Sequence, residues 1–182
     1  MSAPATNKIP VAFPSDEWAR KYMEILNNSK EYEASAKDWE GSMLFVIQPD
    51  GGATPFEIGV WLDLWHGKCR GYKFWVDGQE KPQSDYIFAG PEKNWLLLLA
   101  GKLDPIQGLM AGKFALKSGK MQMVMRHTLA AKHLVTHLQA FDMDIVTADT
   151  KDPGAKVVKF FDKSKNLVVT VDREKKTFMV HK

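Results

Sequence analysis

The sequence predicts an α+β fold in which a five-stranded, mainly antiparallel sheet is covered on one face by helices. Three observations predict it: an amphipathic helical pattern near the N-terminus, a run of short strand patterns separated by turns, and renewed helical patterns before a strand-rich tail. The chain has 182 residues, 45% of them hydrophobic, which is enough for one sizeable core. Its net charge of +3, from 25 basic and 22 acidic residues, is too even to predict a nucleic-acid partner.

The first helix is predicted to begin at Ser15. This serine precedes Asp16 and Glu17, and together they form an N-cap signal with acidic residues where the helix dipole favours them. Apolar side chains then recur at helical spacing, at Trp18, Tyr22, Ile25 and Leu26. Because these positions form a single stripe, we expect this helix to lie on the sheet.

Four strand patterns follow, each rich in β-branched or aromatic residues: 43–48, 56–65, 72–76 and 85–89. Short runs of turn residues separate them, and none of the gaps is long enough for a crossover helix. The predicted connection is therefore a series of antiparallel hairpins. A fifth strand is predicted at residues 113–117.

Helical signals return after the fourth strand. Residues 91–101 hold an apolar helical segment, and Asp104 followed by Pro105 is an N-cap with proline at the first helical position. Residues 121–141 are predicted to be helical, with a break near residues 126–128. These helices close the domain, which we place at residues 14–141.

The C-terminal region, residues 142–182, changes from helical patterns to strand patterns. Three strand patterns joined by charged turns, at 157–161, 167–171 and 177–180, predict a three-stranded β extension. Three strands alone are only marginally stable. We expect the extension to lengthen the main sheet, to cover one of its edges, or to pair with another subunit as a homodimer.

Residues 1–13 are predicted to be a disordered lead-in, because they contain polar residues and prolines and lack the apolar core of a signal peptide. The single cysteine, Cys69, forms no disulfide within the chain, which favours a reducing compartment. No apolar run approaches the roughly 20 residues needed to cross a bilayer. We therefore expect a soluble, cytoplasmic protein.

Residues 103–121 carry the most distinctive pattern, LDPIQGLMAGKFALKSGKM. A short helix leads into Gly-Lys and a hydrophobic strand, and a glycine turn leads into the closing helices. This stretch resembles the sterol carrier protein family of non-specific lipid-transfer proteins. The agreement continues upstream with the Trp39-Glu40-Gly41 entry to the first strand and the YIFAG strand at residues 86–90, so the resemblance covers about residues 14–141.

The resemblance implies an apolar tunnel between the sheet and the closing helices. The expected function is non-catalytic binding or transfer of lipids, fatty acyl derivatives or sterol-like molecules, without a cofactor and with transient membrane contact. Methionine and aromatic side chains adapt to such ligands, although at these spacings they more often belong to a solid core than to a cavity wall. The predicted ligand-binding residues are Trp61, Trp75, Phe88, Trp95, Leu99, Leu109, Met110, Phe114, Met121, Met125, Leu134 and Leu138.

Lysines near the tunnel, at positions 113, 117 and 120, have two interpretations. They contact acidic head groups, or they form a solvated rim. The sequence leaves both open for Lys113, Lys117 and Lys120.

Histidines and the cysteine are the first candidates for metal binding or catalysis. His133 and His137 lie one helical turn apart, with His127 nearby, but no carboxylate or thiol in that segment completes a metal site. His66 and Cys69 lie in a hairpin turn without a third group to orient the histidine. We predict neither a metal site nor a catalytic site.

Asp63 is the candidate acid of an alternative hypothesis, in which the chain is an enzyme or accessory subunit acting on a polycyclic or acyl substrate in the same cavity. On an alternating strand this residue shares a face with Trp61 and Trp65, and that face is as consistent with solvent as with a cavity. A second alternative is a dimerisation or interaction module with a solid core.

Overall fold

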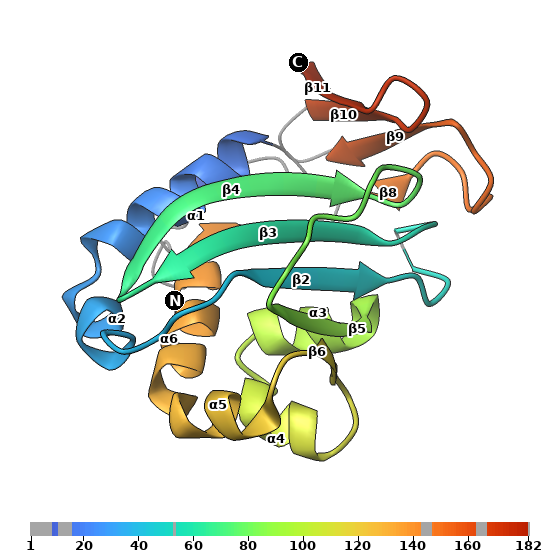
Figure 1. Cartoon of the computed structure of the whole chain (residues 1–182). Coiled ribbons are helices and arrows are strands. Elements are labelled where there is room, and N and C mark those ends of the chain that lie inside the picture. The colour runs from blue at the N-terminus through green and yellow to red at the C-terminus, as the bar shows by residue number, and fades with distance from the viewer. Residues whose placement is uncertain (1–8, 11–15, 53, 143–146, 163–166, 182) are drawn as a thin grey trace, which may run out of the picture.

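The computed structural model describes residues 9–10, 16–52, 54–142, 147–162 and 167–181. A five-stranded sheet carries helices on one face, and a smaller sheet packs beside one of its ends (Figure 1). The strands of the main sheet are β2 (Met43–Gln48), β3 (Ile58–Trp65), β4 (Lys68–Val76), β5 (Tyr86–Pro91) and β6 (Ala115–Ser118), in the spatial order β4-β3-β2-β5-β6. The predicted α+β fold with a five-stranded, mainly antiparallel sheet is confirmed.

The connection between β4 and β5 differs from the prediction of successive hairpins. β5 does not pair with β4 but lies parallel to β2, with Phe88 opposite Phe45. Most side chains of β2 are buried on both faces of the sheet, as is typical of a central strand, and β5 supplies its second neighbour. The segment of residues 77–85 can pass over β3 and β2, because β4 and β5 lie three strand spacings apart, about 14 Å, and nine residues reach about 30 Å.

The helices form one layer against the sheet (Figure 1). They are α1 (Asp16–Asn28), α2 (Lys30–Ser35), α3 (Glu92–Leu99), α4 (Pro105–Met110), α5 (Met121–Arg126) and α6 (Thr128–Leu138). The predicted stripe of α1 holds, since Trp18, Tyr22 and Leu26 are buried; its predicted cap, Ser15, lies outside the described residues. The predicted break near residue 127 is confirmed by the separation of α5 from α6.

The face of the sheet opposite the helices carries a second, smaller apolar cluster. Trp75 and Leu44 are buried there, and Trp61 is packed against them. The segment that leads from β4 to β5 crosses this face (Figure 1), and the indole Nε1 of Trp75 donates a hydrogen bond to the carbonyl oxygen of Gln79, 3.2 Å away. This segment therefore shields apolar side chains that no helix covers.

The C-terminal extension forms a separate antiparallel sheet in the order β11-β10-β9-β8. Its strands are β8 (Thr147–Ala148), β9 (Val157–Asp162), β10 (Leu167–Asp172) and β11 (Thr177–His181). The three predicted strands are present, and the short β8 was not predicted. Buried side chains from this sheet and from the end of the main sheet share one apolar cluster, which contains Phe56, Ile58, Val76, Val158, Phe160, Val169 and Val171.

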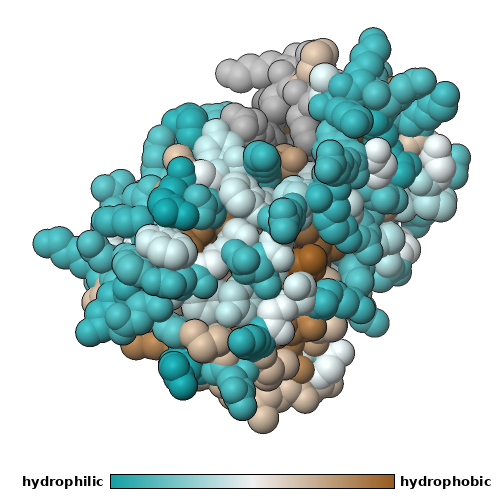
Figure 2. All heavy atoms as spheres, viewed as in Figure 1, coloured by the Kyte–Doolittle hydropathy of each residue, from teal (hydrophilic) through white to brown (hydrophobic). Residues whose placement is uncertain are grey.

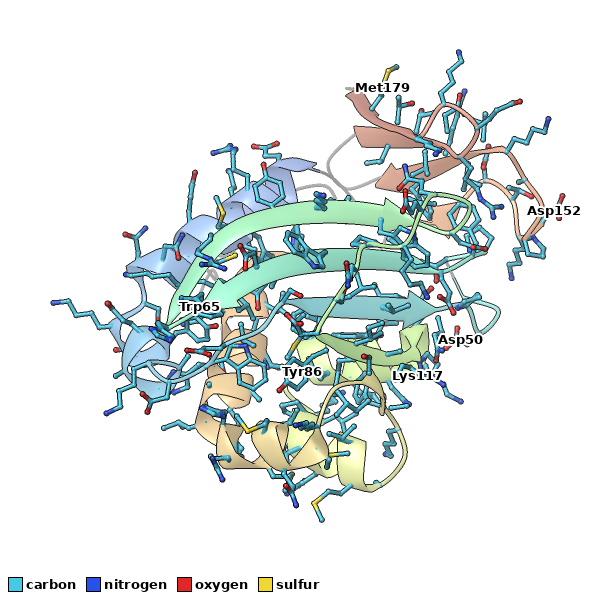
Figure 3. The ribbon with its side chains drawn as sticks, in the orientation of Figure 1. Asp50, Trp65, Tyr86, Lys117, Asp152 and Met179 are labelled. Atoms are coloured by element: carbon cyan, nitrogen blue, oxygen red, sulfur yellow. The ribbon has the colours of Figure 1, made fainter. Side chains whose placement is uncertain are left out.

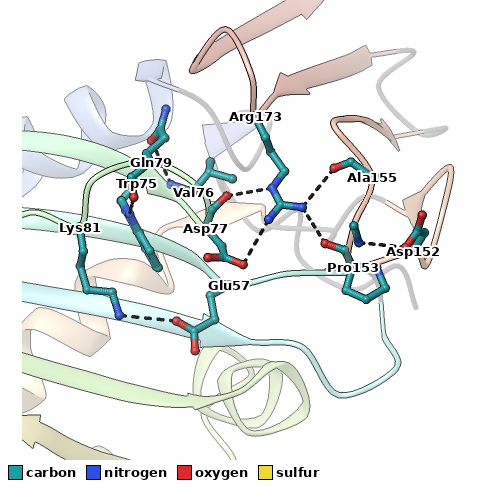
Figure 4. Close-up of polar contacts among 11 residues, drawn as sticks. Glu57, Trp75, Val76, Asp77, Gln79, Lys81, Asp152, Pro153, Ala155 and Arg173 are labelled. Atoms are coloured by element: carbon teal, nitrogen blue, oxygen red, sulfur yellow. Dashed lines mark hydrogen bonds and ion pairs between the residues drawn. The ribbon is translucent and has the colours of Figure 1, made fainter.

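Arg173 joins the two sheets (Figure 4). Its guanidinium donates hydrogen bonds to the carbonyl oxygens of Asp77, Pro153 and Ala155, at 2.8, 2.6 and 3.1 Å. It also pairs with the Asp77 carboxylate at 3.2 Å and lies 4.3 Å from the ring centroid of Phe56. The extension thus packs against its own chain.

The predicted lead-in, residues 1–13, lies outside the described residues except for β1 (Ile9–Pro10). That pair of residues lies parallel to β7 (Phe141–Asp142). Within the described residues, no helix is long and apolar enough to cross a membrane.

Candidate functional site

A small apolar cavity lies between the sheet and the helices α2, α5 and α6. Its volume is about 20 Å³, and its walls are Tyr32, Trp39, Met43, Leu64, Val124, His127, Ala131 and Leu134. Space of this size holds about one water-sized molecule. In this conformation the cavity is too small for a lipid.

Two polar groups of the cavity wall, the Trp39 indole and Nδ1 of His127, are engaged by the backbone. The Trp39 indole nitrogen donates to the carbonyl oxygen of Gly41 at 2.9 Å, and Nδ1 of His127 lies 2.9 Å from the carbonyl oxygen of Met123. The His127 ring meets the Trp39 ring edge-on, with centroids 5.2 Å apart. Because a carbonyl oxygen only accepts, His127 carries its proton on Nδ1, and the cavity wall is predominantly apolar.

Helix α5 covers the cavity and is weakly anchored. Val124 is its one buried side chain and Met123 is partly buried, whereas Met121 and Met125 are 44% and 39% exposed. No side chain caps its N-terminus. A helix of fewer than two turns that buries so little surface contributes little free energy to hold it in place.

The ends of α5 are marked by backbone irregularities. Gly119 precedes it with a φ of +102°, and a Cβ there would lie 2.2 Å from the ring of Tyr86. His127 follows it outside the helical region, with φ −108° and ψ 36°. Figure 3 labels Tyr86 on the strand β5 beside this helix. These two breaks separate α5 from the strand β6 before it and from α6 after it.

The predicted ligand-binding residues fall into three locations. Seven lie between the sheet and the helices, buried or packed against the main core: Phe88, Trp95, Leu99, Leu109, Phe114, Leu134 and Leu138. Trp61 and Trp75 belong to the cluster on the opposite face of the sheet. Met110, Met121 and Met125 are exposed. Only Leu134 among the twelve lines the cavity described above.

Three of the inward residues form a closed aromatic cluster. The rings of Phe88 and Phe114 stack with centroids 4.7 Å apart, and Trp95 meets them at 5.6 and 5.1 Å. The Trp95 indole donates to the carbonyl oxygen of Val46 at 2.9 Å, and Gly90 lies so close that a Cβ there would fall 2.3 Å from Phe114. This part of the interior is filled by side chains.

The structure separates the candidate catalytic groups. Asp63 lies on the face opposite the helices and accepts two hydrogen bonds from Arg70, at 3.1 and 3.0 Å. His66 is exposed and lies 2.8 Å from a carboxylate oxygen of Glu40. Cys69 is buried and donates to the carbonyl oxygen of Gly71, and burial raises the pKa of its thiol to about 11. His66 and Cys69 therefore have different partners, and the thiol stays protonated at neutral pH.

His133 and His137 lie side by side on α6, with ring centroids 6.5 Å apart. Nε2 of His137 is 2.8 Å from the hydroxyl of Ser29, and burial, followed by the neighbouring His133, lowers the pKa of His137. The described residues contain no group of three or more His, Cys, Asp or Glu side chains placed to hold a metal ion. His137 therefore ties α6 to Ser29, the N-cap of α2.

Seven residues of the cavity wall were not predicted from the sequence. Two signals point in retrospect to five of them, and neither signal covers Tyr32 or Trp39. Helical spacing across the break between α5 and α6 relates Val124, His127 and Ala131 to Leu134. Met43 on β2 and Leu64 on β3 occupy positions that face the helices. The spacing alone does not reveal that these faces leave unfilled space.

The described residues thus form a five-stranded sheet covered on one face by helices, with a small apolar cavity between the two layers. The family model for the SCP-2 sterol transfer family matches residues 22–132, and the chain belongs to this family. It resembles the crystal structure of a sterol carrier protein 2 with 34% identity and a TM-score of 0.62, covering 69% of this chain and 95% of the other.

A second solved structure is similarly close. It is a conserved hypothetical protein from Thermus thermophilus, with 31% identity and a TM-score of 0.62, covering 75% of this chain and 92% of the other. The comparison with the curated proteins found no match.

Proposed function

We propose that this protein binds and carries a lipid, a fatty acyl derivative or a sterol-like molecule in the apolar space between the main sheet and helices α5 and α6. The observation that carries the proposal is a partly open apolar cavity beside α5, a helix held by one buried side chain. Membership of the SCP-2 sterol transfer family supports the same function. Asp63, the candidate acid of the enzyme hypothesis, is paired with Arg70 away from this space, which favours a non-catalytic role.

Binding requires the cavity of about 20 Å³ to widen toward the roughly 300 Å³ of a small-molecule pocket. Displacing α5 uncovers Val124 and Met123, at a cost of about 1.5–3 kcal/mol for each side chain. A lipid that buries about 300 Å² of apolar surface returns about 7 kcal/mol at roughly 25 cal/mol per Å². The opened state is therefore accessible when a ligand occupies it, and the tunnel forms on binding.

Within this proposal, Leu134 from the predicted set contacts the ligand, together with Val124 and Ala131 on the same helical stripe. Met121 and Met125, at the exposed side of α5, line the entrance. The closed cluster of Phe88, Trp95 and Phe114 forms the end of the tunnel. The walls of this space offer apolar contacts and no charged anchor, which predicts tolerance of several ligand classes.

We further propose that residues 14–141 form the lipid-binding domain and that residues 142–182 are an extension that stabilises its end. The contacts of Arg173 with Asp77 and Phe56 favour packing within one chain over a homodimer, and the mass in solution of the full chain distinguishes the two. The single, buried Cys69 is consistent with the reducing cytoplasm.

The test is titration of the full chain with a fluorescent fatty acid. Ala131→Trp places an indole in the cavity and is expected to weaken binding at least tenfold. Ala34→Trp adds the same indole at an exposed position of α2 and is expected to leave binding unchanged. If both variants bind as the parent does, or if the parent does not bind at all, the proposed site is refuted.

A further inference from the structure

Charge is distributed unevenly along the chain. Residues 93–141, which include most of α3 and all of α4, α5 and α6, contain six lysines and one arginine but one acidic residue, Asp104. This segment therefore carries a net charge of +6 in a chain whose total is +3, and the remainder carries −3. One side of the protein is cationic although the whole is nearly neutral.

These cations are available for a partner. Lys132 pairs with Asp104 at 3.6 Å, and among the described residues the other six cations of this segment form no ion pair. Elsewhere on the surface several cations are neutralised, as Arg70 is by Asp63 and Arg173 by Asp77.

Exposed apolar side chains gather on the same segment. The described residues include nine exposed large hydrophobic side chains, and six of them belong to residues 93–141: Leu96, Leu97, Met110, Met121, Met125 and Leu129. Figure 2 shows apolar surface at the end of the molecule where α4 and α5 lie. Figure 3 labels Lys117 on this side and Met179 at the opposite end. Apolar and cationic groups are therefore concentrated on one side.

A shallow groove between α3 and the end of α4 combines both kinds of group. Its volume is about 870 Å³, and its walls include Leu96 and Leu97 together with Lys93, Lys102 and Lys113. These five residues are called the docking groove below. The exposed leucines form its apolar part, and the lysines stand around them with long apolar stems and charged tips.

We propose that the docking groove binds the protein to an anionic membrane surface. Leucines of a surface helix enter the boundary between head groups and acyl chains, while lysines beside them contact lipid phosphates. An anionic membrane satisfies both the apolar and the cationic groups of this groove. The groove contains none of the walls of the cavity beneath α5, so docking is a separate property from lipid binding.

The experiment is sedimentation of the full chain with vesicles of phosphatidylcholine alone or mixed in equal parts with phosphatidylglycerol. The protein is expected to bind the mixed vesicles, less so at high salt, and to stay in solution with phosphatidylcholine. Each lysine close to an anionic surface strengthens binding about fivefold. Replacing Lys93, Lys102 and Lys113 by glutamine is therefore expected to weaken binding about 100-fold.

A matched control removes the same charge elsewhere. Lys37, Lys151 and Lys175 are exposed, and their replacement by glutamine is expected to weaken binding by less than fivefold. Equal weakening by the two triple variants would show attraction to net charge alone and would overturn the proposal. So would equal binding of the parent to both kinds of vesicle.

The leucines test the apolar half of the groove. The double variant Leu96→Ser, Leu97→Ser is expected to bind the mixed vesicles about tenfold more weakly, whereas Val157→Ser, Met179→Ser, at exposed positions of the C-terminal sheet, is expected to bind unchanged. A leucine variant that binds like the parent would point to a purely electrostatic partner, such as a nucleic acid, and would overturn docking to a membrane.

Docking and lipid binding can fail independently in these experiments. The triple lysine variant is expected to bind a fluorescent fatty acid in vesicle-free solution as tightly as the parent does. The Ala131→Trp variant is expected to lose the fatty acid and to keep its affinity for the vesicles.

Discussion

Truncating Leu134 to alanine separates the stability of the interior from its ability to bind a ligand. The Leu134 side chain is 5% exposed and forms part of the cavity wall. Removing about three carbon atoms loses roughly 2.4 kcal/mol of transfer free energy at about 0.8 kcal/mol per methylene. The space that remains adds about 24 cal/mol per Å³, so we expect a total loss of about 3–4 kcal/mol in the free energy of unfolding.

The same change enlarges the cavity, which is only about 20 Å³ in the parent. A ligand then enters with less displacement of α5, and we expect the fluorescent fatty acid to bind more tightly. Guanidinium unfolding measures the first effect and ligand titration the second. Leu138→Ala is the control, because Leu138 is 4% exposed on the same helix and is not among the cavity walls.

The two variants are expected to be destabilised to a similar extent, and only Leu134→Ala to gain affinity. A gain of affinity in both variants would show that general loosening, rather than space at this position, admits the ligand. A loss of stability below about 1 kcal/mol for Leu134→Ala would contradict the packing described here, since truncation of a well-packed leucine costs at least twice that.

Three further predictions concern stability. Arg173→Ala removes the hydrogen bonds to Asp77, Pro153 and Ala155 and is expected to lower the free energy of unfolding by about 2–3 kcal/mol. Hydrogen exchange should accelerate first in β9 and β10. Uniform acceleration over the whole chain would contradict the role of Arg173 in joining the two sheets. Gly119→Ala forces a side chain into a positive φ and against Tyr86, which should lower the free energy of unfolding by about 2 kcal/mol or more; an unchanged urea midpoint would contradict this geometry. Burial raises the pKa of the Cys69 thiol from about 9 to about 11. The protonated thiol therefore stabilises the folded state fully below pH 9, and this stabilisation, up to about 2.7 kcal/mol, is lost as the pH rises through 11. Unfolding measured between pH 8 and 11 should show this loss in the parent, and a loss of the same size in Cys69→Ala would show that another group causes it.

Much of the fold could be predicted because its signals are local. The apolar stripe at Trp18, Tyr22 and Leu26 specifies α1, and Asp104 caps α4 as predicted, accepting hydrogen bonds from the backbone nitrogens of Ile106 and Gln107. Such features depend on residues within one or two turns of each other. The order of the strands was less predictable, because β5 pairs with a strand more than 35 residues earlier in the sequence.

The candidate site was predicted only in outline. The sequence placed apolar side chains between the sheet and the closing helices, and seven of the twelve predicted residues lie there. It could not distinguish residues that fill the interior, such as Phe88 and Phe114, from those that border open space, such as Ala131. That difference depends on how side chains from several elements meet, and apolar composition is the same in both cases.

The sequence by itself determined where the helices and most strands form, that the chain belongs with the sterol carrier proteins, and that it carries an excess of positive charge between residues 93 and 141. These properties follow from local spacing, caps and composition. Only the tertiary structure decided that β5 lies beside β2, that Asp63 is turned away from the interior, and that a loosely held α5 covers an apolar cavity. Each of these depends on contacts between residues far apart in the chain, and such contacts form only when the whole core packs.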